Sequence, residues 1–362
     1  MHLPRTIKEW RRSLGNLLVI QKNRLMGRSF VPAPRFAIAI ETSARCNLAC
    51  RFCAYPKRGP GNFMTMERFS NSVEQACENG ISEFWLTPML GEVFADPNWI
   101  EKFQFLEQHE GVGSFKFYTN FILPSPDQIS KLSQFKKLSE LHISVYGHDH
   151  ESFKQISSKP CSQYNRLIKN LSALESILPE TPFPNGVHIS IRTLNRMSFE
   201  QLPISEMMSK IHVLLKYPKV TGIVSLDYDS WAGYVSHEDV ENLGIEITDG
   251  KRIYMHGACS VLFSMPQIGV DGSVRACACR DVDGSLTLGN LDVRPLTELY
   301  SWSNPKFREI VKTQQQGRFN DNCRSCSMYR SIYDHRSAGS DGRWLTMPLE
   351  GAIKMMGGKA DG

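Results

Sequence analysis

The sequence predicts an α/β protein built on a parallel sheet and followed by a small cysteine-rich domain. Six short apolar segments with β-branched or aromatic residues recur between residues 36 and 229, and helix-like segments separate them. Strand–helix alternation of this kind is typical of βαβ units and therefore of parallel strands. Six units are fewer than the eight of a closed barrel, so a partial TIM-like barrel and an open sheet both fit.

The expected elements follow one another in a regular order. The strands are expected at 36–41, 83–88, 115–119, 141–146, 187–193 and 222–227. The helices are expected at 66–79, 98–108, 127–137, 164–177 and 199–216. Parallel strands need a crossover of about this length between them. We therefore assign residues 36–230 to one α/β domain.

Polar side chains alternate with apolar ones along three of the expected strands. In 187–193, for example, His188, Ser190 and Arg192 share one face. Strands of an ordinary parallel sheet are buried on both faces and contain mostly apolar residues. The polar face needs hydrogen-bonding partners. Either a polar ligand inside the barrel or a network of buried polar groups and water could supply them.

The alternation ends near residue 230, and the rest of the chain divides into three parts. We expect a connector at 231–258, a cysteine-rich domain at 259–336 and a glycine-rich flexible tail at 337–362. Within the second part, Asp271-Gly272 predicts a type I′ turn that joins strands at 267–270 and 273–277. A helix is expected at 295–315, with Pro295 near its start.

The positive charge of the chain is concentrated at its N-terminus. The net charge is +5, and residues 1–36 hold eight Lys or Arg against one acidic residue. A nucleic-acid-binding protein would spread basic residues over its folded domain, so we expect none bound here. Residues 1–35 are expected to form a basic helix and a connector, because their apolar residues recur at helical spacing. This helix is expected to pack on the main domain or to make a peripheral membrane or partner contact.

The sequence also indicates a cytoplasmic protein. It has no apolar run of about 18 residues and no cleavable secretion signal. In such a chain, clustered cysteines are more typical of metal or cluster ligands than of disulfides. The isolated Cys77 and Cys161 are instead expected to be small buried residues.

Three cysteines directly follow the first expected strand. Cys46, Cys50 and Cys53 are separated by three and by two residues. Three thiolates can hold one cuboidal iron–sulfur cluster and leave its fourth iron without a protein ligand. A zinc site would normally have four ligands, and no fourth is evident nearby. The spacing therefore predicts a cluster whose open iron can bind a small molecule.

With this motif the sequence resembles the radical S-adenosylmethionine (SAM) superfamily. Members carry a C-x3-C-x-aromatic-C loop after the first strand of a partial (β/α)6 barrel, and Phe52 occupies the aromatic position. The resemblance implies a [4Fe–4S] cluster that binds the amino and carboxylate groups of SAM. One electron then cleaves SAM to methionine and a 5′-deoxyadenosyl radical, which takes a hydrogen atom from the substrate.

The resemblance extends to weaker motifs that follow in the family's order. Gly91 and Glu92 match the end of its G-G-E segment, which meets the SAM amino group, although Leu90 replaces the first glycine. Asn120 lies in a segment similar to T-N-G, with Phe121 in place of glycine, and Ser144 falls at a fourth-strand position that often contacts SAM. A basic residue near the SAM carboxylate is also implied. It could be any of Lys154, Lys159 and Arg166.

A second set of cysteines occurs near the C-terminus: Cys259, Cys277, Cys323 and Cys326. Four thiolates satisfy either a [4Fe–4S] cluster or a structural zinc. The C-x12-G-x4-C start of this set resembles SPASM/twitch domains, which implies a second, auxiliary [4Fe–4S] cluster. Because no further cysteine follows, the shorter twitch form with one auxiliary cluster is implied. Cys279 could replace Cys277 as a ligand.

The second cluster suggests an oxidoreductase. The resemblance to twitch-type aminocyclitol dehydrogenases implies a small polar substrate and an auxiliary cluster that accepts an electron. Proton acceptors could be His188, Asp227 or Tyr146, but Arg192 and Asp229 are preferred. A flavodoxin or ferredoxin is implied as electron donor. The alternatives are a radical SAM enzyme that crosslinks a ribosomal peptide and an epimerase that uses Cys279 or Cys161 as hydrogen donor.

Overall fold

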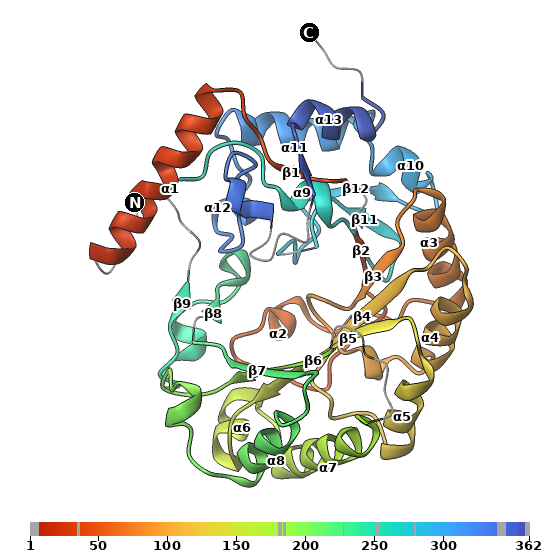
Figure 1. The fold of residues 1–362 in the computed structure, drawn as a ribbon, viewed down its shortest axis with the longest axis vertical. Helices are drawn as coiled ribbons and strands as arrows, with labels where there is room; N and C mark the ends of the chain where they lie inside the picture. Colours follow the sequence, from red (N-terminus) through yellow and green to blue (C-terminus); the bar gives the residue numbers. More distant parts are fainter. Residues whose placement is uncertain are drawn as a thin grey trace.

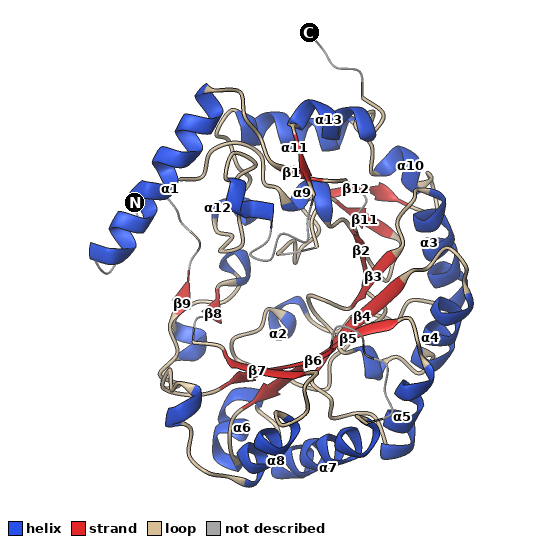
Figure 2. Ribbon diagram, in the orientation of Figure 1, coloured by secondary structure: helices blue, strands red, loops and turns tan. Residues whose placement is uncertain are grey.

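The structure is a computed structural model that describes residues 7–34, 37–179, 183, 186–226, 228–248, 250, 254–278, 280–338 and 345–358. Its centre is a strongly curved sheet of nine strands, with helices along the outer side (Figures 1 and 2). The strand order is β12-β11-β10-β2-β3-β4-β5-β6-β7. The expected partial barrel is therefore present, and the C-terminal region extends its sheet.

The six barrel strands are parallel and lie in sequence order. Their bounds are β2 (Ala37–Ile40), β3 (Glu83–Leu86), β4 (Ser114–Thr119), β5 (Leu138–Tyr146), β6 (Gly186–Arg192) and β7 (Val220–Val224). All six coincide with expected segments. Strand β5 starts three residues before the expected 141–146, and β7 ends before the expected residue 227, which lies outside the described residues.

The outer helices are α3 (Met66–Glu78), α4 (Trp99–Gln108), α5 (Pro126–Ser130), α6 (His150–Ser157), α7 (Cys161–Ile177) and α8 (Glu206–Leu214). Buried aromatic side chains such as Phe84, Phe103 and Phe115 fill the layer between these helices and the sheet. The expected helix at 199–216 is wrong in its first half. Only a 3-10 turn forms at Phe199–Gln201, and α8 starts after Pro203, whose ring would clash inside a continuous helix. The sequence analysis missed α6.

The inner, polar face of the barrel divides into two halves. Toward the amino ends of the strands the polar groups bond to one another: His142 and Lys116 bind the carboxylate of Glu140 at 2.7 and 3.2 Å, and His188 bonds to Thr221 at 2.8 Å. Nearer the carboxyl ends of the strands, the polar side chains face a cavity instead. A network of polar groups therefore accounts for the first part of this face. For the second part, a polar ligand stays a prediction.

The cysteine-rich region continues the barrel sheet. Strand β10 (Gln267–Ile268) runs parallel to β2, and β11 (Ser273–Arg275) and β12 (Thr287–Asn290) pair antiparallel beside it. The hairpin is confirmed, but its turn is not type I′. Gly272 has φ +81° whereas Asp271 does not have a positive φ, and the amide of Gly272 bonds to Gly269 at 2.9 Å. The Asp271 carboxylate accepts instead from the backbone and hydroxyl of Ser273.

Short helices complete the C-terminal region: α9 (Val261–Ser264), α10 (Leu296–Leu299), α11 (Pro305–Gln315) and α12 (Asp321–Arg324). The single helix expected at 295–315 is thus split in two, and Pro305 begins the second helix. The expected flexible tail is ordered over 345–358. There β13 (Thr346–Met347) pairs with β1 (Val31–Pro32), and Met356 at the end of α13 (Leu349–Met355) is fully buried.

The N-terminal helix α1 (Ile7–Leu25) lies beside the C-terminal region rather than the barrel (Figure 1). Asn23 donates to the carbonyl of Tyr333 at 2.8 Å, and Ile20 is fully buried. Leu18 and Leu25 remain 69% and 86% exposed, so a contact with a membrane or a partner stays a prediction. Among the described helices, none combines the length and the apolar character needed to cross a bilayer.

The connector between the two regions contributes β8 (Tyr228–Asp229), the 3-10 turns η4 (Trp231–Gly233) and η5 (Glu238–Val240), and β9 (Ile247–Thr248). It packs against the first cysteine loop. Arg51 donates to the carbonyls of Asp239 and Glu241 at 2.9 Å each, and Lys57 pairs with the Asp239 carboxylate at 2.5 Å. These contacts hold the connector beside the loop that carries Cys50 and Cys53.

Candidate active site

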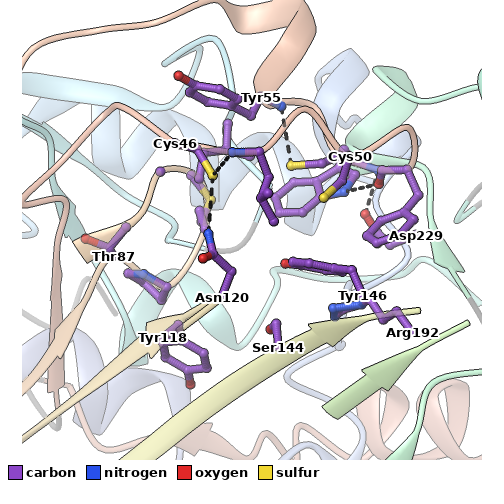
Figure 3. Close-up of a pocket in the computed structure, with 18 of the residues that line it drawn as sticks. Cys46, Cys50, Tyr55, Thr87, Tyr118, Asn120, Ser144, Tyr146, Arg192 and Asp229 are labelled. Atoms are coloured by element: carbon purple, nitrogen blue, oxygen red, sulfur yellow. Dashed lines mark hydrogen bonds between the residues drawn. The ribbon is translucent and has the colours of Figure 1, made fainter. Parts of the chain in front are cut away.

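A cavity of about 490 Å³ lies at the carboxyl ends of the barrel strands (Figure 3). This is where parallel α/β barrels place their active sites. Eleven residues predicted from the sequence line it: Cys46, Cys50, Phe52, Cys53, Gly91, Glu92, Asn120, Ser144, Tyr146, Arg192 and Asp229. The fold thus brings together one cysteine loop and the ends of five strands or the loops that follow them.

The cysteine loop leaves β2 and covers the cavity from one side (Figure 3). Backbone amides already point at two of its sulfurs: Leu48 donates to Cys46 Sγ and Tyr55 donates to Cys53 Sγ, each at 3.4 Å. Burial raises the pKa of Cys46 to about 12, and the charge of Glu92 adds to this shift. Burial also raises the pKa of Cys50 and Cys53. The positive charge of Arg192 lowers both pKa values and so offsets part of this effect.

This donor set fits a [4Fe–4S] cluster. These three thiols, of which Cys50 is buried and Cys46 and Cys53 are partly buried, become good ligands only when a cation replaces their protons, and iron supplies that charge. Amide donors to the sulfurs are a usual feature of such clusters. Among the described residues that line the cavity, there is no fourth cysteine and no histidine. One iron would therefore remain open toward the cavity.

Gly91 and Glu92 follow β3 and lie against the cysteine loop. Gly91 has φ +95°, and a Cβ there would lie 2.0 Å from the carbonyl oxygen of Ser43. Only glycine fits this position. The Glu92 carboxylate is buried and accepts from Thr119 Oγ1 at 2.6 Å and from the amide of Asn120 at 2.7 Å. Burial raises its pKa to about 7, although these hydrogen bonds lower it.

Asn120, just after β4, and Ser144 on β5 face the cavity, and Asn120 reaches the cysteine loop (Figure 3). The side-chain amide nitrogen of Asn120, Nδ2, donates to Asn47 Oδ1 at 2.8 Å and lies 3.8 Å from Cys46 Sγ. Asn120 therefore orients the loop as well as facing the cavity. The Ser144 hydroxyl makes no side-chain hydrogen bond within the described part of the chain and is available to a ligand.

Arg192 presents a positive charge to the cavity from the end of β6. Its guanidinium lies 5.7 Å from the centre of the Phe52 ring. Phe52 also contacts the rings of Tyr146 and Tyr228, at centroid distances of 5.5 and 4.9 Å. Within the described residues, no hydrogen bond or ion pair engages the Arg192 side chain. This guanidinium is thus free to bind an anionic group.

The three residues considered for the SAM carboxylate are placed elsewhere. Neither Lys154, Lys159 nor Arg166 lines the cavity, and Arg166 donates to the carbonyl of Leu123 at 2.5 Å. His188 lies toward the amino ends of the strands, where its ring forms a hydrogen bond with Thr221. Asp227 lies outside the described residues. Arg192 and Arg280 are the basic residues among the described residues that line the cavity.

Asp229 faces the cavity from β8, but other residues already bind its carboxylate. Arg280 pairs with Oδ1 at 2.7 Å, the backbone amide of Trp231 donates to the same oxygen at 2.5 Å, and the Ser327 hydroxyl donates to Oδ2. The sequence analysis missed Arg280, Trp231 and Ser327 as cavity residues. Only their sequence positions could have indicated two of these residues. Arg280 lies three residues after Cys277, and Ser327 directly follows Cys326.

The second cysteine set belongs to the C-terminal region. Burial raises the pKa of Cys323 well above its ordinary value. The nearby sulfurs of Cys259 and Cys326 raise it further. Gln314 connects two of them, since its amide donates to Cys323 Sγ at 3.3 Å and its carbonyl accepts from the backbone of Cys259 at 2.8 Å. The amide of Met328 donates to Cys326 Sγ at 3.3 Å. Cys279 lies outside the described residues.

The two isolated cysteines behave differently from each other. Cys77 is half-buried on α3, where its sulfur lies 3.8 Å from His109 Nδ1. Cys161 is exposed at the start of α7, so the expectation of a buried position is wrong for this residue. Helix α7 begins one turn earlier than expected and places Cys161 on the surface. Neither cysteine lines the cavity.

Comparisons with known families match both regions. Residues 40–180 match the family described as the radical SAM superfamily, and residues 259–327 match the SPASM family, described as an iron–sulfur cluster-binding domain. These two domains imply a SAM-binding [4Fe–4S] cluster and auxiliary iron–sulfur binding. No match was found among curated proteins.

Solved structures show the same fold at low identity. SuiB of Streptococcus suis bound to its precursor peptide SuiA has a TM-score of 0.57 and 16% identity, over 93% of this chain and 77% of that one. Native anSMEcpe with AdoMet and the Kp18Cys peptide has a TM-score of 0.53 and 18% identity, over 89% of this chain and 96% of that one. BtrN in complex with AdoMet and 2-DOIA has a TM-score of 0.50 and 14% identity, over 83% of this chain and 96% of that one. With this fold, both family matches and the cavity geometry, the chain is a radical SAM superfamily enzyme with a SPASM domain.

Proposed function

We propose that this enzyme oxidises a small polar substrate, such as a sugar or an aminocyclitol, by two electrons. A [4Fe–4S] cluster on Cys46, Cys50 and Cys53 would supply the electron that cleaves SAM to methionine and a 5′-deoxyadenosyl radical. A reductant such as a flavodoxin or ferredoxin provides that electron. The adenosyl radical removes one hydrogen atom from a substrate C–H bond. Cys259, Cys277, Cys323 and Cys326 would hold an auxiliary [4Fe–4S] cluster that accepts one electron from the substrate radical, and a carboxylate of the cavity would accept the proton.

The cavity residues divide between SAM and the substrate in this proposal. The Gly91-Glu92 segment meets the SAM amino group, and Asn120, Ser144 and Phe52 line the rest of the SAM site. Arg192 binds an anionic group, since a guanidinium stays charged and cannot act as a base at neutral pH. Asp229 and Glu92 are the carboxylates among the residues that line the cavity. Asp229 would receive the substrate proton.

One observation supports the auxiliary cluster as electron acceptor. The wall of the cavity includes Arg280, Ser327 and Met328, which come from the C-terminal region. Arg280 follows Cys277 by three residues, and Ser327 is the neighbour of Cys326. The segments that carry two proposed auxiliary ligands therefore border the space in which the substrate radical would form. A purely structural metal at the second set would not need this contact.

Anaerobic reconstitution followed by iron and sulfide analysis tests the two clusters. We expect about eight irons per chain, whereas a structural zinc at the second set would leave about four. Cys46→Ala should abolish 5′-deoxyadenosine formation with dithionite and SAM. Cys77→Ala is the matched control, because this cysteine lies outside both sets. A chain that keeps its activity without Cys46 would refute the proposal.

A peptide substrate is the second candidate, and strand β7 favours it. Within the described part of the chain, β7 forms the edge of the nine-stranded sheet. Ile223 on this strand is 63% exposed, and Leu226 just after it is 36% exposed. An extended peptide can pair with a free sheet edge and place apolar side chains on such residues. The product would then be a crosslinked peptide.

The two substrate classes can be distinguished by stimulation of SAM cleavage. Small polar metabolites and peptides are added separately to the reduced, reconstituted enzyme, and 5′-deoxyadenosine is measured by chromatography. Ile223→Asp should weaken stimulation by a peptide but leave stimulation by a small polar molecule unchanged. Epimerisation has less support, because Cys161 does not line the cavity and Cys279 lies outside the described residues.

A further inference from the structure

An ion pair lies between the two cysteine sets. Asp229 belongs to β8 in the connector that follows the barrel, whereas Arg280 belongs to the C-terminal region, three residues after Cys277. Arg280 Nε and Asp229 Oδ1 are 2.7 Å apart, and the two side chains are only 19% and 16% exposed. Charges in such a partly buried place are weakly screened and act on their surroundings over several ångströms.

The pair is anchored to both cysteine sets. The Arg280 guanidinium lies 4.4 Å from the centre of the Trp231 ring, and the Trp231 indole N–H donates to the carbonyl of Phe52 at 2.9 Å. Phe52 is covalently joined to Cys53. On the other side, the Ser327 hydroxyl donates to Asp229, and Ser327 is covalently joined to Cys326. The position of Arg280 is therefore fixed relative to the first cysteine loop.

The charge of Arg280 reaches the first cysteine loop. Arg280 and Cys53 line the same cavity, and Trp231 lies between the guanidinium and the loop. The positive charge of Arg280 accordingly favours the charged form of the Cys53 sulfur. Stabilisation of a thiolate by a nearby cation has the same physical origin as stabilisation of a reduced cluster, which carries one more negative charge. Net charge and hydrogen bonding near a cluster are among the factors that set its potential.

We propose that the Asp229–Arg280 ion pair tunes the reduction potential of the cluster on Cys46, Cys50 and Cys53. Arg280 favours the reduced cluster, and Asp229 offsets part of its charge. This inference rests on the proposed function, because it requires that the three cysteines hold a redox-active cluster. Both residues act here as positioning charges. They make the potential of the first cluster depend on contact between the barrel and the C-terminal region.

Potentiometric titration followed by electron paramagnetic resonance tests the proposal on the reconstituted enzyme. The signal that changes when SAM is added identifies the first cluster. Arg280→Gln should lower its potential and Asp229→Asn should raise it, because the two changes remove opposite charges. The double variant should lie between the single variants. Arg280→Lys keeps the charge and should stay near the wild-type potential.

Arg68→Gln is the matched control. Arg68 on α3 pairs with Asp292 of the C-terminal region at 2.7 Å, but neither residue lines the cavity. This variant should leave the potential unchanged. If Arg280→Gln and Asp229→Asn shift the potential in the same direction, or no more than Arg68→Gln does, the tuning role is wrong. Failure of the proposed function itself would appear differently, as a wild-type enzyme without a SAM-sensitive signal.

Discussion

Replacement of Lys102 by methionine should destabilise the barrel far more than loss of an ordinary ion pair. Lys102 on α4 is completely buried, and its ammonium pairs with Asp96, which is 1% exposed. The same ammonium donates to the carbonyl of Met64 at 2.5 Å. Methionine retains most of the side-chain volume but leaves the Asp96 carboxylate buried without its counter-charge. Breaking a buried pair on one side costs about 3–5 kcal/mol.

The measurement is urea unfolding of the metal-free protein by circular dichroism. With a denaturant slope of about 3 kcal/mol per molar urea, this cost lowers the midpoint by about 1–2 M. Lys210→Met is the control, because Lys210 pairs with Glu175 at 2.9 Å on the partly exposed outer helices. That pair should contribute no more than about 1 kcal/mol. Equal midpoints for the two variants would refute the reasoning.

The double variant Lys102→Met/Asp96→Asn separates charge from packing. It should regain much of the lost stability, because neither buried charge remains without a partner. The pair also matters for function. Asp96 ends the loop that carries Gly91 and Glu92, and its carboxylate accepts from the amide of Asn98 at 3.0 Å. Lys102→Met should therefore also weaken SAM binding to the reconstituted enzyme.

Three further predictions concern single residues. Gly91→Ala forces a Cβ against the carbonyl of Ser43 and should reduce SAM affinity at least about tenfold by calorimetry, whereas Gly15→Ala on α1, with open space around it, should not. Burial raises the pKa of Glu140, but the hydrogen bond from His142 and the charge of Lys116 outweigh it and lower the pKa to about 2. Glu140 thus stabilises the fold above its unfolded pKa of about 4.5, and this contribution is lost as the pH falls toward 2. Thermal melts should accordingly show Glu140→Gln less stable than the parent at pH 7 and a gap that closes below pH 4.5; a gap that widens in acid would contradict the assignment. Arg192→Ala should leave the melting temperature nearly unchanged but lower the 5′-deoxyadenosine rate at least about tenfold, the loss of one charged hydrogen bond to a ligand, and an unaltered rate would remove Arg192 from the site.

The first cysteine motif could be interpreted from the sequence because it is local. Cys46, Cys50 and Cys53 lie within eight residues, so a short loop brings them together in any fold that places it after a strand. The strands could be predicted for a similar reason. Their apolar runs are buried in a parallel sheet and stand out against the amphipathic helices. Pro203 and Pro305 were present in the sequence as helix-breaking residues, but the predicted helices ran through them. In the structure α8 starts after Pro203, and α11 starts at Pro305.

The second cysteine set shows where local information ends. Cys259 and Cys326 are 67 positions apart in the sequence. Only the folded C-terminal region places both of them close enough to Cys323 to affect its pKa. That the region extends the barrel sheet through β10 was also not predictable. The strand at 267–270 was predicted, but its pairing with β2 joins residues more than 220 positions apart and is not encoded in either segment alone.

The sequence by itself determined that a redox-cluster loop follows the first strand of an α/β domain, since ligand type and spacing are local properties. Only the tertiary structure decided which distant side chains share the cavity. Arg192 lines the cavity whereas Lys154, Lys159 and Arg166 do not, and Arg280 pairs with Asp229, 51 positions away in the sequence. Such pairings depend on strand register and on the packing of two regions. Both are global properties of the fold, and no short segment of sequence contains them.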